Sequence, residues 1–177
     1  IEKNFIFGGR SMNDFTILHL SDLHFNKEGN KLSILHENLI RDIEVEMKVS
    51  DNIILVVTGD ILDKAKYKYK DNAIVFFRKL YQILGHKIKG LYIVPGNHDK
   101  IRNVMDEFLI LEYNVLQRQR KKQEFYQQYW NYLKMAFYEY FELLKDIYQE
   151  FPDIIYPKNI ERDTYGVETI QINGKNL

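Results

Sequence analysis

Three short runs of apolar residues, each ending at polar residues, form the clearest pattern in the chain. They cover residues 15–20, 53–57 and 91–94. All three contain the β-branched and aromatic residues that favour strands. The second run is apolar at every position, which is typical of a strand buried on both faces of a parallel sheet. We therefore expect three strands.

The residues between these runs have helical spacing. In residues 31–49, apolar side chains recur every three or four positions, and they are Leu32, Leu35, Leu39, Ile43 and Met47. In residues 72–84, the set expected to face inward is Ala73, Phe76, Leu80 and Leu84. Gly85 follows this second set at a position that helix ends favour. Both segments are therefore expected to be amphipathic helices.

The order strand, helix, strand, helix, strand predicts an α/β fold. Right-handed crossovers would build a parallel βαβαβ sheet covered by helices. Ligands bind such sheets beyond the carboxyl ends of the strands. The residues at these positions are Asp22, His24, Asp60, Asn97 and His98. The sequence thus predicts a functional site where three strand ends meet.

The side chains at these strand ends are suited to holding metal ions. Asp22 and His24 are one residue apart, so an oxygen and an imidazole nitrogen can turn toward one ion. Asp60 follows a glycine, which permits a tight turn, and its two carboxylate oxygens can bridge two cations. Asn97 offers a neutral oxygen, and His98 beside it can face a substrate.

A pair of bound cations would allow this site to act on phosphate groups. Two ions about 3.5 to 4 Å apart clamp a phosphate, polarise phosphorus and lower the pKa of a bound water. Taken separately, an Asp-x-His triplet is usually a solvated loop, and Gly-Asp is an ordinary turn. Their placement at three successive strand ends favours a metal site.

Composition limits the partners, metal ligands and cellular location that can be expected for the protein. The chain has 177 residues, a formal net charge of zero and no cysteine. Balanced charge gives no overall attraction to nucleic acid or membrane. The lack of cysteine excludes disulfides and thiolate ligands and leaves oxygen and nitrogen as metal ligands. We find no signal peptide and no apolar run that would cross a bilayer, so we expect a cytoplasmic protein with no membrane partner.

The three strand ends together resemble the opening signatures of the calcineurin-like metallophosphoesterases. The signatures are Asp22-Leu23-His24, Gly59-Asp60-Ile61-Leu62-Asp63 and Gly96-Asn97-His98-Asp99, in the family's order and spacing. The resemblance implies that Asp22 and His24 ligate a first divalent metal and that Asp60 bridges. Asn97 would ligate a second metal. Two ions of Mn, Fe or Zn would serve the complete enzyme.

The resemblance also implies a reaction. Metal-bound hydroxide would attack the phosphorus of a phosphodiester or phosphomonoester. His98 would contact the phosphoryl oxygens or protonate the leaving group, and Asp63 would orient its imidazole, since a carboxylate partner fixes the tautomer. Asp99 is interpreted as mainly structural. The form Ser21-Asp22-Leu23-His24-Phe25 is more similar to phosphodiesterases and nucleases of the family than to its protein phosphatases.

Two other functions stay open. A DNA-processing nuclease subunit of the same family would suit the basic residues that follow the motifs, because Lys64, Lys66 and Arg102 are candidates for substrate binding. The alternative for residues 64–70 is a solvated loop with no role in binding. A non-catalytic scaffold with this fold is the other function, and it would use the aromatic helices as its interface.

The sequence also departs from the family pattern. The family completes its site with three further histidines, whereas this chain has none after His98. We therefore expect residues 12–177 to be the N-terminal portion of the domain, with its C-terminal half missing, and to hold one metal ion or none. Residues 1–11, which precede Met12, are expected to be a vector-derived tag.

A long helical insertion is expected at about residues 104–151. Residues 101–151 contain no glycine or proline, and one stripe holds Phe125, Tyr129, Leu133, Phe137, Phe141, Leu144 and Tyr148. A single helix over residues 115–150 would be about 54 Å long, so we expect a hairpin, a cap or a surface for self-association or partner binding. The basic residues 117–122 fit a solvated helix face or a nucleic-acid contact. A strand at 165–170 would precede an Asn173-Gly174 turn.

Overall fold

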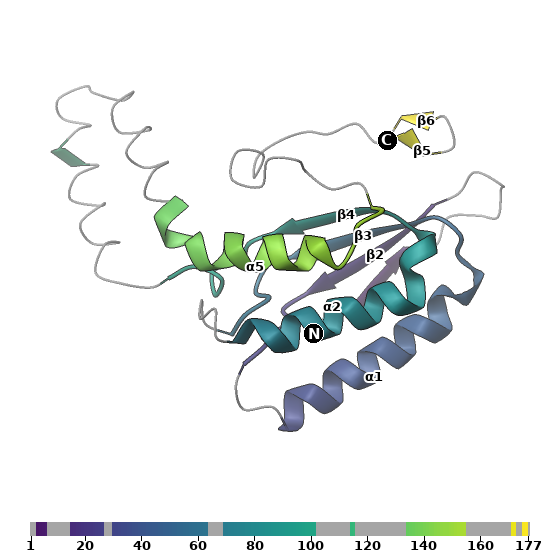
Figure 1. Ribbon diagram of the computed structural model, residues 1–177, viewed down its shortest axis with the longest axis horizontal. Coiled ribbons are helices and arrows are strands. Elements are labelled where there is room, and N and C mark those ends of the chain that lie inside the picture. The colour runs from purple at the N-terminus through teal and green to yellow at the C-terminus, as the bar shows by residue number, and fades with distance from the viewer. Residues whose placement is uncertain are drawn as a thin grey trace.

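A computed structural model describes residues 3–6, 15–26, 30–63, 69–101, 114–115, 134–154, 171–172 and 175–176. At its centre is a four-stranded sheet of order β1-β2-β3-β4 (Figure 1). The three strands expected from the apolar runs are present. They are β2 (Thr16–Ser21), β3 (Ile53–Thr58) and β4 (Ile88–Val94).

These three strands are parallel, as the alternating pattern predicts. Leu18 of β2 is paired with Leu55 of β3, which is paired with Leu91 of β4. All three leucines are buried at 1% exposure or less. Because the strands run in one direction, their carboxyl ends lie at one edge of the sheet, where the polar motifs follow. The predicted α/β fold is confirmed.

Three helices lie side by side on one face of this sheet (Figure 1). α1 (Asn30–Glu46) joins β2 to β3, and α2 (Lys70–Leu84) joins β3 to β4. α5 (Tyr138–Gln149) packs beside α2. Short 3₁₀ turns at Met47–Val49 and Gly85–Lys87 follow α1 and α2. Parallel strands in sequential order with crossovers of one hand place their helices on the same face.

The other face of the sheet carries a smaller apolar cluster. Ile54 is 7% exposed there, and Phe15, Val56 and Tyr92 pack against it half-buried. His19 lies on this face in register with Val56, and its Nε2 is 2.6 Å from the Thr58 hydroxyl. Among the described residues, His19 therefore lies away from the helices, which cover the opposite face.

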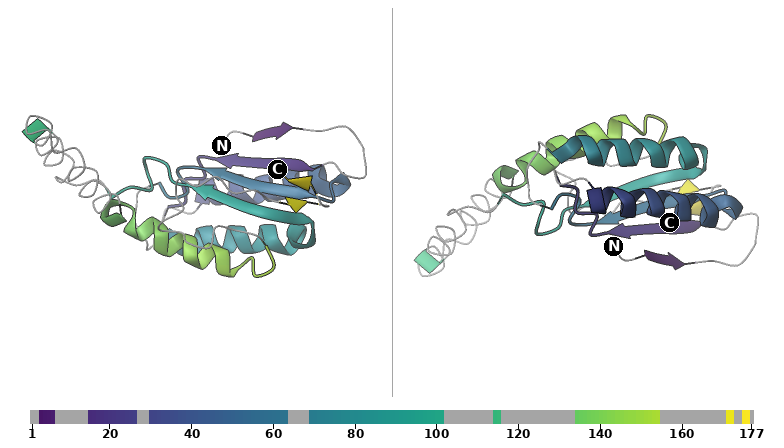
Figure 2. Two further views of the ribbon diagram at one scale, coloured as in Figure 1. Left: turned by 90° about the horizontal axis from the view of Figure 1, so that it is seen from above. Right: turned by 90° about the horizontal axis from the view of Figure 1, so that it is seen from below.

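A fourth strand lies within residues 1–11, for which the sequence predicted no strand or helix. β1 (Lys3–Ile6) pairs antiparallel with β2, with Phe5 opposite Leu18. In Figure 2, β1 lies beyond β2 at the edge of the sheet. Part of residues 1–11 therefore adds to the sheet, whatever its origin.

The buried face of α1 differs from the expected one. Leu39, Ile43 and Met47 are at most 2% exposed, as predicted, but Leu35 is 51% exposed. The neighbouring His36 is buried instead, at 8% exposure. The prediction that Leu35 faces inward is therefore wrong. The stripe is rotated by one residue, because positions 36, 40, 43 and 47 also repeat at helical spacing.

The described part of the expected insertion belongs to the core. α5 buries three residues of the predicted stripe, which are Phe141, Leu144 and Tyr148. Ion pairs join α5 and the residue after it to α2, between Lys70 and Asp146 at 3.0 Å and between Arg78 and Glu150 at 2.8 Å. This part of the stripe is thus buried in the hydrophobic core. Most of residues 104–133, including the basic run, lies outside the described residues.

A small hairpin lies near the end of the sequence. β5 (Gln171–Ile172) pairs antiparallel with β6 (Lys175–Asn176). Asn173 and Gly174, where the turn was predicted, lie outside the described residues, and so does the predicted strand at 165–170. Among the described helices, none has the length and apolar character needed to cross a membrane.

Candidate metal centre

The loops that follow β2, β3 and β4 are joined by backbone hydrogen bonds. Asp22 N–H donates to the Gly59 carbonyl at 3.3 Å, and His24 N–H donates to the Asp60 carbonyl at 2.9 Å. Gly59 N–H in turn donates to the Val94 carbonyl at 2.9 Å. The parallel pairing of the strands thus continues into the loops and brings the motifs side by side.

Several of these residues have unusual backbone conformations. Asp22, His24 and Asp60 have φ values of 55°, 50° and 51°. Positive φ is uncommon for residues other than glycine, although aspartate and histidine tolerate it better than most. Such conformations cost about 1–3 kcal/mol each and persist where the surrounding structure enforces them, typically at functional sites.

Two glycines allow the second and third loops to touch. Gly59 has φ 77°, and a Cβ placed on it would lie 2.9 Å from the Cα of Gly96. A Cβ placed on Gly96 would lie 2.1 Å from the Asp60 Oδ1 and 2.4 Å from the Asp60 backbone nitrogen. Both distances are shorter than real carbon contacts. The Asp60 carboxylate therefore has its position because residue 96 has no side chain.

Asp99 fixes the same two loops from beneath. Its carboxylate is fully buried and accepts hydrogen bonds from the N–H groups of Gly96, Ile61 and Leu62, at 2.9, 3.3 and 2.9 Å. Burial raises the pKa of the Asp99 carboxyl, the three N–H donors lower it, and the charge of Asp60 raises it further. These contacts agree with a mainly structural Asp99.

The candidate ligand atoms form two groups that share one histidine. Atoms of Asp22, His24 and Asp60 lie within 4.8 Å of one another, and so do atoms of His24, Asp63 and His98. Nε2 of His24 is 3.7 Å from Oδ1 of Asp22. Nδ1 of His24 is buried and has no hydrogen-bond partner among the described residues. Carboxylate oxygens beside an unsatisfied imidazole nitrogen fit a divalent cation.

His98 is held at two points. Its backbone N–H donates to Oδ1 of Asp60 at 2.8 Å, and its ring nitrogen Nδ1 is 2.6 Å from the backbone carbonyl oxygen of Asp63. A carbonyl only accepts, so Nδ1 carries the proton, and Nε2 is the nitrogen able to exchange one. We expected Asp63 to orient this imidazole, and the contact is made by its main chain instead of its carboxylate.

A comparison with family models decides the class of the protein. The calcineurin-like phosphoesterase model matches residues 15–170. The chain belongs to this family. The resemblance of the three motifs to this family is thereby confirmed.

A curated relative agrees with this assignment. The "Uncharacterized metallophosphoesterase-like protein YydB" of Bacillus subtilis (strain 168) is 31% identical over 93 residues. The match covers 52% of this chain and 19% of the relative, so it spans less than a fifth of the relative's length. No solved structure gives a significant match.

Of the other site residues predicted for this calcineurin-like phosphoesterase, the structure describes Asn97 but not the three basic residues. Asn97 is exposed, and its chain neighbours Gly96 and His98 both contact Asp60. Lys64, Lys66 and Arg102 lie outside the described residues.

Sequence reasoning missed two residues that support the site. The Ser21 hydroxyl is in hydrogen-bond contact with the Asp22 carboxylate and lies 2.8 Å from the Thr58 carbonyl oxygen. His36 Nε2 lies 2.8 Å from the Leu23 carbonyl oxygen. The position of Ser21 directly before Asp22 could have indicated its supporting role. A lone histidine in a helix, such as His36, gives no comparable signal.

The buried His36 of this phosphoesterase makes stability depend on pH. Burial lowers the pKa of its imidazole below the ordinary value, and the Leu23 carbonyl and the charge of Glu37 oppose this less strongly. The unfolded chain therefore takes up a proton near pH 6.5, before the folded chain does. We expect the free energy of unfolding to fall as pH drops below about 6.5, and this contribution to be complete above that value.

Urea unfolding at pH 7.5 and pH 5.5, for the natural chain and for His36→Gln, measures this effect. Glutamine does not titrate, so the natural chain should lose more stability between the two pH values than the variant. An equal loss in both proteins would contradict the prediction.

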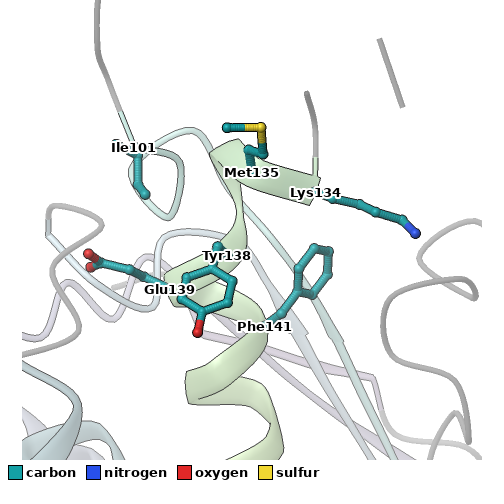
Figure 3. A pocket seen from close by; sticks show the side chains of 6 residues that line it. All are labelled: Ile101, Lys134, Met135, Tyr138, Glu139 and Phe141. Carbon is teal, nitrogen blue, oxygen red and sulfur yellow. The ribbon is translucent and has the colours of Figure 1, made fainter. Parts of the chain in front are cut away.

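An open pocket of about 380 Å³ lies where the third loop meets the start of α5 (Figure 3). It is lined by Ile101, Lys134, Met135, Tyr138, Glu139 and Phe141. Ile101 is three residues after His98, so their Cα atoms are at most about 11 Å apart. Ile101 N–H also donates to the Ala136 carbonyl at 2.9 Å, which ties the third loop to the segment before α5. Aromatic and apolar groups form much of its wall.

Proposed function

We propose that this calcineurin-like phosphoesterase binds divalent cations at the metal centre and hydrolyses a phosphodiester there. The observation that carries the proposal is the grouping of Asp22, His24 and Asp60, whose ligand atoms lie within 4.8 Å of one another at the meeting point of three loops. Bound cations would polarise the ester and lower the pKa of a water. The mixed oxygen and nitrogen ligands suit Mn, Fe or Zn.

The chain's own residues have distinct roles in this proposal. Asp22, His24, Asp60 and Asn97 hold the cations. His98 contacts the phosphoryl group and, when both of its ring nitrogens are protonated, gives the Nε2 proton to the leaving oxygen. Its Nδ1 bond to the Asp63 carbonyl at 2.6 Å supports this role, since it fixes both the ring orientation and the tautomer.

The pocket beside Ile101 supports an ester that carries an organic group. Met135 and Tyr138 line it and are 65% and 60% exposed, so apolar surface is available on the segment to which Ile101, three residues after His98, is hydrogen-bonded. Ligand pockets typically combine such apolar walls with a few polar groups. A diester presents an organic group on each side of phosphorus, so one of them can lie in this pocket.

Hydrolysis of bis(p-nitrophenyl) phosphate by the chain tests the proposal, with Mn²⁺ added and then removed by a chelator. We expect slow, Mn²⁺-dependent release of nitrophenol, because His19 and His36 are engaged elsewhere and no histidine follows His98. His98→Gln should reduce turnover on the order of 100-fold or more, while Mn²⁺ affinity is retained.

Each other outcome identifies a different function. Turnover that survives the chelator or His98→Gln would contradict the proposal. Preference for p-nitrophenyl phosphate would indicate a phosphomonoesterase, and metal-dependent cleavage of DNA would indicate the nuclease alternative. Mn²⁺ binding without turnover of any of these esters would favour the scaffold.

A further inference from the structure

A buried histidine on α1 lies directly beneath the first loop of the metal centre. The imidazole of His36 packs against two aromatic rings that also contact each other, with centroids 4.2 Å from Phe25 and 5.7 Å from Phe76. The side chain is 8% exposed. His36 is in neither group of candidate ligand atoms among the described residues.

The polar contact of His36 is made with the loop itself. Its Nε2 is 2.8 Å from the carbonyl oxygen of Leu23, so Nε2 carries the proton and donates it. Leu23 lies between Asp22 and His24, the two residues of this loop with positive φ. This hydrogen bond holds the carbonyl side of the Leu23–His24 peptide, which lies between two candidate ligands.

The other backbone hydrogen bonds described for this loop join it to the second loop, and in one of them the Phe25 carbonyl accepts from Asp63 N–H at 3.1 Å. Asp22, His24 and Phe25 donate to carbonyl groups of the neighbouring loop, at 3.3, 2.9 and 2.8 Å. These bonds set the distance between the two loops. The Leu23 carbonyl and the His24 N–H belong to one planar peptide group, so this peptide is held from two sides, by Asp60 through its N–H and by His36 through its carbonyl.

We propose that His36 is a positioning residue, which holds the Leu23 carbonyl so that the side chains of Asp22 and His24 turn toward one cation. This inference rests on the proposed metal centre. Outer-shell hydrogen bonds that orient metal ligands typically contribute a factor of about 10–100 to metal affinity. His36 acts one step further out, through the main chain, so we expect a factor near the lower end.

His36→Leu and His36→Gln separate positioning from packing. Leucine fills the site but cannot donate a hydrogen bond, whereas the glutamine amide can reach the same carbonyl. Mn²⁺ titration should show affinity about 10-fold weaker for His36→Leu and within about twofold of the natural chain for His36→Gln. The matched control is His86→Leu, at the opposite end of the strands, which should leave affinity unchanged.

Amide hydrogen exchange without metal provides an independent readout. The His24 and Phe25 amides should exchange faster in His36→Leu than in His36→Gln, because the loop loses its anchor. Unchanged affinity and exchange in His36→Leu would overturn the inference, and so would equal loss in both variants, which indicates packing alone. If the natural chain binds no Mn²⁺, the proposed metal centre fails, and exchange still tests whether His36 holds the loop.

Discussion

Gly96→Ala is expected to remove Mn²⁺ binding and to destabilise the fold. The new Cβ would lie 2.1 Å from Oδ1 and 2.8 Å from Cγ of Asp60, so the carboxylate and the loop that carries it must move. Overpacking a tightly packed site costs about 1–3 kcal/mol. The displaced Asp60 would also lose its hydrogen bond from the His98 backbone N–H. Urea unfolding and Mn²⁺ titration measure the two effects.

Gly85→Ala is the matched control. Its φ is −46°, which alanine adopts easily, and its Cβ would meet only the ring of Tyr81, 2.8 Å away. A side-chain ring can shift where a backbone cannot. We expect this variant to bind Mn²⁺ as the natural chain does. Normal Mn²⁺ affinity in Gly96→Ala would show that Asp60 is not a ligand in the position described.

Asp60→Asn is the second variant with a large expected effect. Asparagine keeps an oxygen that can accept the His98 N–H at 2.8 Å, so the loop should keep its shape. It removes the negative charge and one of the two anionic oxygens. Loss of a residue that only hydrogen-bonds to a ligand weakens metal affinity about 10–100-fold. Because Asp60 is itself a proposed ligand, we expect Asp60→Asn to weaken Mn²⁺ affinity about 100-fold or more.

Asp51→Asn serves as the control for charge. Asp51 is exposed and lies just before β3, at the opposite end of the strand that leads to Asp60. The two variants have the same change in net charge, so only the site variant should lose Mn²⁺ affinity. Similar losses in both would mean that the net charge, and not a specific ligand, attracts the ion.

The sequence predicted the parallel sheet and the location of the site because both depend on local patterns. Apolar runs marked β2, β3 and β4, and residues that hold metal stood directly after them. Parallel strands then require the three ends to meet at one edge. Asp22, Asp60 and His98 could therefore be assigned to one site before any contact was known.

Other features depend on contacts that no local pattern contains. Leu35 and His36 are neighbours on α1, and hydrophobicity favours burying the leucine. The histidine is buried instead, because the Leu23 carbonyl provides a hydrogen-bond partner that offsets the cost of burying a polar ring. The hydrogen bond between the Asp63 carbonyl and His98 could not be predicted for the same reason, since any residue at position 63 offers a carbonyl.

Titration of the chain with Mn²⁺, followed by NMR, tests most directly whether three loops pool their ligands around a cation. Bound Mn²⁺ broadens the signals of nearby nuclei. We expect selective broadening of the amides of Asp22, His24, Asp60, Asn97 and His98, with those of α1 beyond His36 unaffected. If Mn²⁺ leaves these five amides sharp, or broadens signals elsewhere in the chain first, the metal centre described here is wrong.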